Sequence, residues 1–198
     1  MRTEENAARR EELWQAAGID ERHAKRKTAE LMQYLPWAAA VKRAWGLLEL
    51  GAPVLALLGD RGNGKTQAAV EIIKTAIRQC RSARYLRCRQ VGMSVRATYR
   101  ADSETTEDQA LRQLVEPWLL VLDECQGQFD TPHELQTLTL LLDMRYGACH
   151  PTVLIANCGE EAFCALMGPA VVDRMREGGG ALVFSWPSFR RPKEREHA

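Results

Sequence analysis

Gly59-Asp60-Arg61-Gly62-Asn63-Gly64-Lys65-Thr66 is the stretch of sequence that decides the fold. It fits the pattern G-x-x-x-x-G-K-[ST], in which the backbone N–H groups of a glycine-rich loop surround a phosphate group. The run before it, Val54-Leu55-Ala56-Leu57-Leu58, is wholly apolar and suits a strand that is buried on both faces of a parallel sheet. The residues that follow, Gln67 to Ile77, have a helical pattern. This stretch therefore predicts a phosphate-binding loop between a buried strand and a helix.

The positions of this loop have separate expected roles in nucleotide binding. We expect Lys65 to reach the outer phosphates and Thr66 to hold Mg²⁺ through its hydroxyl group. The alternative, an ordinary glycine-rich turn, is weakened by the strand before the loop and the helix after it. The predicted nucleotide-binding residues are Gly59, Asp60, Arg61, Gly62, Asn63, Gly64, Lys65, Thr66 and Gln67.

The composition limits the class of protein without identifying a partner. The 198 residues include 27 Lys and Arg against 26 Asp and Glu, so the net charge of +1 says nothing about nucleic acid. A chain of this length can bury one good core. No apolar run approaches the roughly 20 residues of a membrane span, and the charged residues 1–12 lack the apolar region of a signal peptide. We therefore expect a cytoplasmic protein that does not bind membranes.

The six cysteines form no C-x-x-C pair, and a phosphate-binding loop belongs in a reducing compartment. We therefore expect free thiols, mostly in the core. A zinc site is the alternative, but its candidate ligands have a spacing that fits no common zinc finger. These candidates are Cys149, His150, Cys158 and Cys164.

Polar residues end two further apolar strands of the predicted sheet. Asp123 and Glu124 follow Trp118-Leu119-Leu120-Val121-Leu122, and Asn157 follows Thr152-Val153-Leu154-Ile155-Ala156. The carboxyl ends of parallel strands form the rim at which an open α/β sheet binds its ligand. We expect Asp123 to belong to the Mg²⁺ shell, through water, and Glu124 to orient and deprotonate the attacking water.

Two plainer readings of these strand ends remain. An acidic turn is the alternative for the carboxylate pair, and the phosphate-binding loop upstream argues against it. Asn157 could contact the γ-phosphate or the attacking water, although a lone Asn at a strand end is usually a turn residue. Its position, on the strand that follows the Asp-Glu strand, favours the functional role.

Positive charge is concentrated in one segment. Residues 78–100 contain seven arginines and no acidic residue. This segment reads as an alternating strand, residues 84–89, at an edge of the sheet, followed by a helix over residues 90–100. A basic zone of this kind suits a nucleic-acid backbone, and an edge strand protected by charge is the alternative. The predicted DNA contacts are Arg87, Arg89, Arg96 and Arg100.

The N-terminal residues predict a charged helix over residues 4–17, with Leu13 and Trp14 as its only large apolar side chains. It could be a docking arm for a partner or could fold back on the main domain. A second helix should run from Tyr34 to about Leu50. We divide the chain into an N-terminal helical extension, residues 1–35, and a nucleotide-binding domain, residues 36–198.

Later motifs connect the chain with a known family. Strand–loop–helix units with these polar strand ends resemble an AAA+ ATPase. Two segments, Val172-Asp173-Arg174-Met175-Arg176 and Phe184-Ser185-Trp186-Pro187-Ser188-Phe189-Arg190, look like those of DnaC-type bacterial helicase loaders and the related IstB transposition ATPases. The resemblance covers about residues 51–191. It implies an α/β fold, a P-loop NTPase of the AAA+ type with three αβα layers and a parallel sheet, a short N-terminal helical extension and no C-terminal lid domain.

The resemblance also implies residue roles. Glu124 and Asn157 become the Walker B glutamate and the sensor-1 residue, beside the metal ligands Thr66 and Asp123. Arg174 becomes the arginine finger, which in this family reaches the nucleotide of the neighbouring subunit, so that hydrolysis depends on assembly. Arg190 matches a sensor-2-like arginine. Arg145 and Arg176 stay open, since each could be a surface ion-pair residue.

The function implied is that of an ATP- and Mg²⁺-dependent loader, which binds a DnaB-type replicative helicase and single-stranded DNA and forms a homo-oligomer on binding ATP. Zinc at the N-terminus is excluded because no cysteine precedes Cys80, so helicase docking would rest on the helix with Leu13 and Trp14. The alternative is an IstB-like transposition ATPase acting on duplex DNA. A switch that binds nucleotide without hydrolysing it is a third reading, and Glu124 argues against it.

Overall fold

A five-stranded parallel sheet forms the centre of the computed structural model, which describes residues 2–26, 28–100, 104–127 and 132–190. The strand order is β2-β3-β4-β1-β5. The strands are β1 (Val54–Gly59), β2 (Ala83–Arg87), β3 (Leu119–Asp123), β4 (Thr152–Ile155) and β5 (Ala181–Phe184). The predicted α/β class with a parallel sheet is confirmed.

Burial separates the inner strands from the edge strands. Every residue of β3 and β4 is buried, as are the five apolar residues of β1. In contrast, β2 alternates between buried and more exposed residues and lies at an edge, as its sequence predicts. Parallel register places Arg87 beside Asp123, so the ends of β2 and β3 meet at the same rim.

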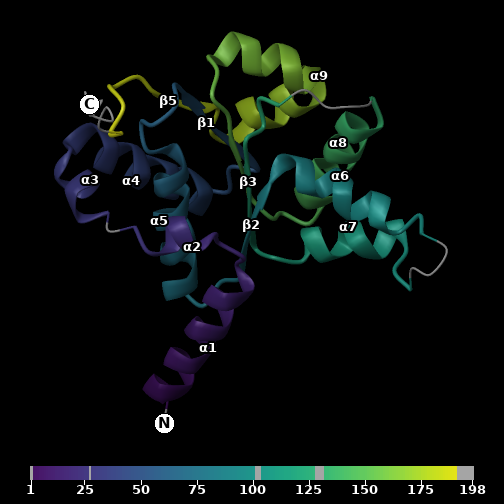
Figure 1. Ribbon diagram of the computed structural model, residues 1–198, viewed down its shortest axis with the longest axis horizontal. Coiled ribbons are helices and arrows are strands. Elements are labelled where there is room, and N and C mark those ends of the chain that lie inside the picture. The colour runs from purple at the N-terminus through teal and green to yellow at the C-terminus, as the bar shows by residue number, and fades with distance from the viewer. Residues whose placement is uncertain (1, 27, 101–103, 128–131, 191–198) are drawn as a thin grey trace, which may run out of the picture.

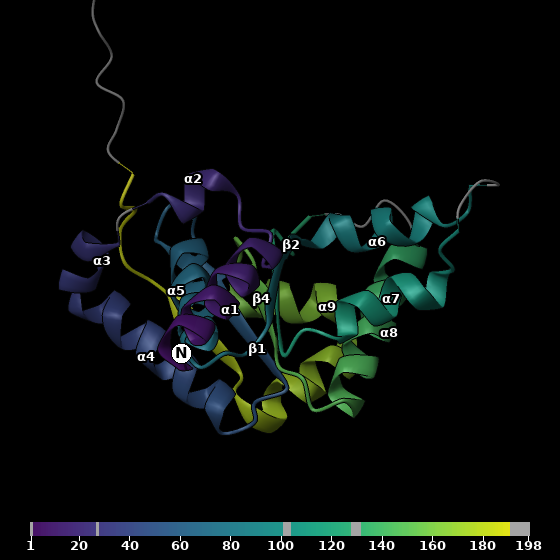
Figure 2. The ribbon, with the colours of Figure 1, turned by 90° about the horizontal axis from the view of Figure 1, so that it is seen from below.

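Helices cover both faces of the sheet and make three layers, as Figures 1 and 2 show. One core cluster joins β1, β3 and β4 to α4 and α5, and a second joins the sheet to α6, α8 and α9. The helices are α1 (Arg2–Ala16), α2 (Glu21–Ala24), α3 (Ala29–Gln33), α4 (Leu35–Glu49), α5 (Lys65–Arg78), α6 (Cys88–Ala97), α7 (Glu107–Val115), α8 (Pro132–Gly147) and α9 (Glu160–Gly178).

The end of α1 packs on the domain. Ala17 is completely buried, and its carbonyl oxygen accepts a hydrogen bond of 2.7 Å from the backbone N–H of Tyr85 in β2. Leu13 and Trp14 are half-buried against the same core cluster as the sheet. The C-terminal end of α1 therefore folds back on the main domain, which was one of the two expectations for this helix. Its N-terminal end projects away from the body of the molecule (Figure 1).

The helix α9 consists of two halves that meet at Gly168. Gly168, with φ of 76°, interrupts the helical backbone, and Pro169 follows it. Proline lacks the N–H group that a continuing helix needs, so the kink has a local cause. By contrast, α2 and α7 were not expected from the sequence.

Arg145 is completely buried, which corrects the suggestion that it is a surface ion-pair residue. Its guanidinium donates to the carbonyl oxygens of Leu114, Val115, Pro117, Trp118 and Pro151 and to the hydroxyl group of Thr152. Burial lowers the pKa of Arg145 to about 9, which still leaves it protonated at neutral pH. Arg145 thus ties the end of α7 and the start of β3 to β4.

Among the residues described, β5 is the last regular element. No helix follows it there, and residues 191–198 lie outside the described residues. The helices described include none with the length and apolar character that a membrane crossing requires.

Candidate nucleotide-binding site

The loop between β1 and α5 has the backbone that its glycines predict. Gly59, Gly62 and Gly64 have backbone φ angles of 126°, 90° and 89°, which residues other than glycine rarely adopt. Space is also short at Gly64, where a Cβ atom would lie 2.7 Å from the indole nitrogen of Trp37. Glycine is therefore required here for both conformation and close packing.

Three donors from outside the loop hold its carbonyl groups. The Trp37 indole donates to Gly64 O at 3.0 Å, the Trp186 indole donates to Asn63 O at 2.9 Å, and the backbone N–H of Phe189 donates to Gly62 O at 2.9 Å. These donors come from α4 and from the segment after β5. With its carbonyl groups engaged on this side, the loop can turn its N–H groups toward an anion.

Lys65 lies at the start of α5 and is almost completely buried. Its ammonium group donates to Gly59 O at 2.8 Å, Asp60 O at 2.6 Å and Asn63 Oδ1 at 3.1 Å. Burial lowers the pKa of Lys65 to about 8. A phosphate oxygen is a stronger acceptor than these neutral groups, so the ammonium group is placed to exchange them for a nucleotide.

Asp123 receives three hydrogen bonds at the end of β3. The Thr66 hydroxyl and the Tyr85 hydroxyl each donate to Asp123 Oδ2 at 2.8 Å, and the backbone N–H of Glu124 donates to Oδ1 at 2.7 Å. Burial and the charge of Asp123 raise the pKa of Tyr85, which therefore stays a donor. An adjacent hydroxyl group and carboxylate fit Mg²⁺, which takes few protein oxygens and completes its shell with water and phosphate.

Glu124 has a backbone φ of 62°, which is strained for a residue with a side chain. Its carboxylate is 57% exposed and lies 3.9 Å from Nε of Arg87. Asn157 follows β4 and lines the same pocket, with its backbone N–H bound to the Gln126 side chain at 3.0 Å. Glu124 and Asn157 are thus brought to the rim beside the loop, as their positions predict.

These residues surround one pocket of about 420 Å³. Basic groups outnumber acidic ones in its walls, which suits a polyphosphate. The basic residues are Arg22, Arg26, Arg61, Lys65, Arg87 and Arg190, and the acidic residues are Asp20, Asp123 and Glu124. Of the predicted loop residues, those from Arg61 to Gln67 line the pocket, whereas Gly59 and Asp60 contribute carbonyl groups that hold Lys65.

Arg174 does not line this pocket. Its guanidinium lies 2.9 Å from Asp143 of α8, donates to Ala170 O at 2.9 Å and stacks 5.3 Å from the centre of the Tyr146 ring. The predicted catalytic residues Glu124, Asn157 and Arg190 therefore share a site within this chain, and Arg174 is held away from it.

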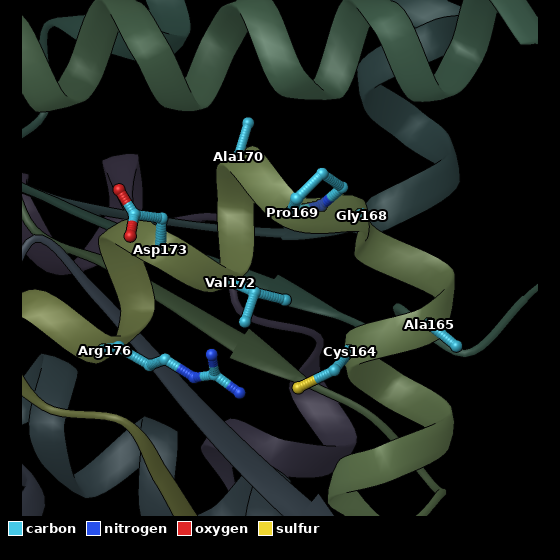
Figure 3. Close-up of a pocket in the computed structure, with 8 residues that line it drawn as sticks. All are labelled: Cys164, Ala165, Gly168, Pro169, Ala170, Val172, Asp173 and Arg176. Atoms are coloured by element: carbon cyan, nitrogen blue, oxygen red, sulfur yellow. The ribbon is translucent and has the colours of Figure 1, made fainter.

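A larger hollow of about 700 Å³ lies at the kink of α9 (Figure 3). Its lining comes from both halves of that helix, with Cys164 before the kink and Arg176 after it. It shares no residue with the nucleotide pocket, and its few polar groups do not form a phosphate site.

The arginines that were predicted to contact DNA are all exposed, but they differ in their contacts within the protein. Arg87 lines the nucleotide pocket and donates to Asp20 at 3.0 Å. Arg96 forms an ion pair with Glu134 of α8. Arg89 shares the exposed surface of α6 with Arg96, and Arg100 follows the end of this helix.

The cysteine prediction is only partly confirmed. All six thiols are free, but Cys88 and Cys125 alone are buried, which corrects the expectation that most lie in the core. No group of three or more potential His, Cys, Asp or Glu metal ligands occurs in the part of the chain that the structure describes. The zinc alternative therefore has no support there.

Several residues of the site carry no motif in the sequence. Tyr85 and Trp37 read as ordinary core positions, and the pocket-lining residues Asp20, Arg22, His23 and Arg26 lie in a polar stretch far from the loop in sequence. The position of Tyr85 could have been predicted from the alternating pattern of β2, because residues two apart in a strand face the same side and Tyr85 therefore lies on the side of Arg87. For the others, only the packing of the N-terminal segment brings them to the pocket.

Fold and site together are those of a P-loop nucleotide-binding protein. The particular family follows from comparison with known proteins. Residues 50–181 match the family model of the IstB-like ATP binding proteins, and the chain belongs to that family.

The curated relatives include replicative helicase loaders and an uncharacterized protein. The chain is 30% identical over 133 residues to the replicative helicase loader DnaC of Escherichia coli strain K12, covering 67% of this chain and 54% of DnaC. It is 31% identical over 144 residues to the uncharacterized protein YdaV of the same strain, covering 72% of this chain and 57% of YdaV. The chain thus spans about half the length of the curated relatives it matches.

Among solved structures, a DnaC helicase loader aligns with a TM-score of 0.64 and 15% identity, covering 87% of this chain and 98% of that chain. The replication initiator DnaA bound to AMPPCP and single-stranded DNA aligns with a TM-score of 0.61 and 17% identity, covering 75% of this chain and 45% of that one. At these identities the likeness supports the fold alone.

Proposed function

We propose that this protein is an ATPase that loads a DnaB-type replicative helicase onto single-stranded DNA. The observation that carries the enzymatic part is the convergence of Lys65, the Thr66–Asp123 pair and Glu124 on one pocket. The loader role is supported by the family and by the similarity to a replicative helicase loader.

In the proposed reaction, the terminal phosphoryl group of ATP passes to water and ADP is released; Mg²⁺, when bound, would offset the negative charge of the phosphates. Lys65 leaves its carbonyl partners to bind the outer phosphates, and Thr66 and Asp123 would hold the metal ion, Asp123 through water. Glu124 accepts the proton of the attacking water. Asn157 orients that water, and Arg190 binds phosphate oxygens.

Hydrolysis depends on a neighbouring subunit in this proposal. Within its own chain, Arg174 is engaged by Asp143 and Tyr146 and stays outside the pocket. A second copy that binds at the open side of the pocket would bring its Arg174 to the γ-phosphate, where a guanidinium can be worth about 10³ to 10⁵ in rate. We accordingly propose that ATP binding promotes homo-oligomers.

Single-stranded DNA is proposed to bind along α6 and the residues after it. Arg89 and Arg100 offer exposed positive charge, and Met93 and Tyr99 are exposed between them. An aromatic ring among basic groups suits a single strand, because bases stack on the ring while cations hold the backbone. Arg87 is assigned to the nucleotide pocket rather than to DNA.

Helicase docking is proposed for α1 in the N-terminal extension. Because Leu13 and Trp14 are half-buried against the domain, substituting them would disturb packing as well as docking. The exposed, charged part of α1 before them is the better target. A variant with Glu4, Glu5, Arg9 and Glu12 replaced by Ala changes this surface and leaves the core intact.

The test is a pull-down of a purified DnaB-type helicase with the full chain, in ATP, in ADP and without nucleotide. We expect capture by the wild type in ATP and loss with the α1 surface variant. Absence of capture in every nucleotide state would refute the loader role. The alternative, a transposition ATPase on duplex DNA, is supported by the family name; tighter binding of a duplex than of the same single strand would favour it.

A further inference from the structure

The segment that joins α1 to α3 is fastened to the nucleotide site. Two contacts reach β2, where Tyr85 N–H donates to Ala17 O at 2.7 Å and Arg87 donates to Asp20 at 3.0 Å. Two more reach α5, the helix that begins with Lys65. In this way residues 17–26 and Thr28 cross the β2 side of the pocket, with α2 above the start of α5 (Figure 2).

On α5, the contacts involve buried polar residues. The Gln67 side chain, which directly follows the metal-binding Thr66, lies 2.8 Å from Nδ1 of His23, and the Thr28 hydroxyl donates to Glu71 at 2.8 Å. Gln67 is only 2% exposed, and its Oε1 atom has no hydrogen-bond partner. Burial lowers the pKa of His23, so Nδ1 of the neutral ring can accept a hydrogen bond from the Gln67 amide group.

Two guanidinium groups of this segment line the pocket. Arg22 and Arg26 are exposed, and neither has an ion-pair or hydrogen-bond partner among the residues that the structure describes. Lys25 provides a contrast, since it pairs with Glu21 at 2.7 Å and does not line the pocket. Within one short stretch, two cations are therefore directed to the pocket, and a third is neutralised outside it.

The position of α2 selects one end of the nucleotide. His23 touches Gln67 and lies within electrostatic reach of Asp123, so α2 covers the metal side of the pocket. Thr66 and Asp123 would hold the Mg²⁺ that accompanies the outer phosphates of ATP. Cations on this side of the pocket are therefore nearer to the terminal phosphate than to the rest of the nucleotide.

We propose that Arg22 and Arg26 bind the terminal phosphate of ATP, so that the N-terminal segment distinguishes ATP from ADP. The inference rests on the proposed nucleotide binding at the loop. Loss of the γ-phosphate removes the anion that both guanidinium groups share, and the segment is then held by its contacts to β2 and α5. The nucleotide state thereby reaches α1, because Ala17 joins that helix to the same segment.

The test measures the dissociation constants of Mg²⁺·ATP and Mg²⁺·ADP by calorimetry for Arg22→Gln, Arg26→Gln and the double variant. Lys25→Gln is the matched control, because it removes an equal charge from the same short segment but outside the pocket. We expect each arginine variant to weaken ATP by about tenfold, and ADP by less than twofold, since a charged hydrogen bond to phosphate is lost. Affinities equal to those of Lys25→Gln, or equal losses for ATP and ADP, would overturn the assignment.

A second readout uses the wild-type chain and needs no variant. Trypsin cleaves after Arg22 and Arg26, and mass spectrometry can follow the two products. We expect a non-hydrolysable ATP analogue to slow both cleavages at least fivefold relative to saturating ADP, because the arginines are engaged. Equal rates in the two nucleotides would refute the inference while leaving nucleotide binding intact. If the wild type bound neither nucleotide, the proposed function itself would fall.

Discussion

The hydroxyl group of Thr66 donates a 2.8 Å hydrogen bond to Asp123, although 57 positions separate the two residues in sequence. Thr66 lies in the first turn of α5 and Asp123 ends β3, so the pair connects two motifs that lie far apart in the sequence. Tyr85 binds the same carboxylate oxygen at 2.8 Å from the edge strand. The metal side of the site is therefore held together by hydrogen bonds among its own residues.

Replacing Lys65 by Ala should abolish nucleotide binding, because the ammonium group that faces the outer phosphates is removed. The measurement is the thermal stabilisation of the protein by Mg²⁺·ATP, which for a bound ligand at 100 times its Kd corresponds to about 2.7 kcal/mol. Lys42→Ala, at an exposed position of α4, is the control and should keep the full shift. A shift in Lys65→Ala that matches the wild type would discredit the loop as the binding site.

Nucleotide affinity should fall as the pH rises above about 8. Burial lowers the pKa of Lys65 to about 8 in the free protein, and a bound phosphate raises it again. Above pH 8 the free lysine is increasingly neutral, so binding must take up a proton and the Kd of ATP should rise by up to about tenfold per pH unit. Phosphate groups themselves titrate near pH 6, outside this window.

This pH dependence can be checked by calorimetry at pH 8.5 in two buffers of different ionisation enthalpy, which reports proton uptake directly. At pH 7 the uptake should vanish, because Lys65 is already protonated. Constant affinity from pH 7 to pH 9.5 would contradict the expectation.

Arg174→Ala and Glu124→Gln should each retain ATP binding and lose hydrolysis, for different reasons. The first removes a guanidinium supplied by the neighbour, and the second removes the base within the pocket. Mixing the two variants should restore part of the ATPase activity, because a subunit with intact Glu124 then meets a neighbour with intact Arg174. Inactive mixtures would argue against action between subunits.

The neighbouring Arg176 serves as the control for this pair. It is exposed, lines the hollow at the kink of α9 and has no ion pair among the residues described. Arg176→Ala should keep nearly full activity. If Arg176→Ala instead kept ATP binding and lost hydrolysis, the role of arginine finger would have to be reassigned to Arg176.

Arg145→Met should destabilise the fold without touching the nucleotide site. The substitution leaves several buried carbonyl oxygens without their donor, at a cost of about 3 kcal/mol or more in the free energy of unfolding. Urea unfolding should show a lower midpoint with an unchanged slope. Arg112→Gln, which breaks only an exposed pair with Asp108, should not change the midpoint measurably.

Trp186→Phe should weaken ATP binding by shifting the loop. It removes the indole donor to Asn63 O, while a phenyl ring can keep the contact with Phe184, whose ring centre lies 4.8 Å away. Loss of one hydrogen bond of about 1 kcal/mol predicts an increase in the Kd of ATP of about fivefold. Trp45→Phe, which affects an aromatic pair remote from the loop, should leave the Kd unchanged. Equal Kd values in both variants would contradict the bracing role.

The sequence by itself determined the features that depend on neighbouring residues. The apolar run ending at Gly59 and the spacing to Lys65 specify a strand, a tight loop and a helix, because burial on both faces and positive φ leave few other solutions. Asp123 and Asn157 could be placed at the rim for a similar reason, since parallel strands all end at the same edge.

Tertiary structure alone decided which distant groups complete the site. Arg87 was predicted from its sequence to contact DNA, and only the meeting of β2 with β3 and the contact with Asp20 bring it to the nucleotide pocket. Arg145 looked like a surface residue because nothing local reveals that it closes a gap between α7 and β4. The N-terminal segment reaches Gln67 only because Ala17 is buried against β2, and such long-range packing depends on shape and burial that no short pattern records.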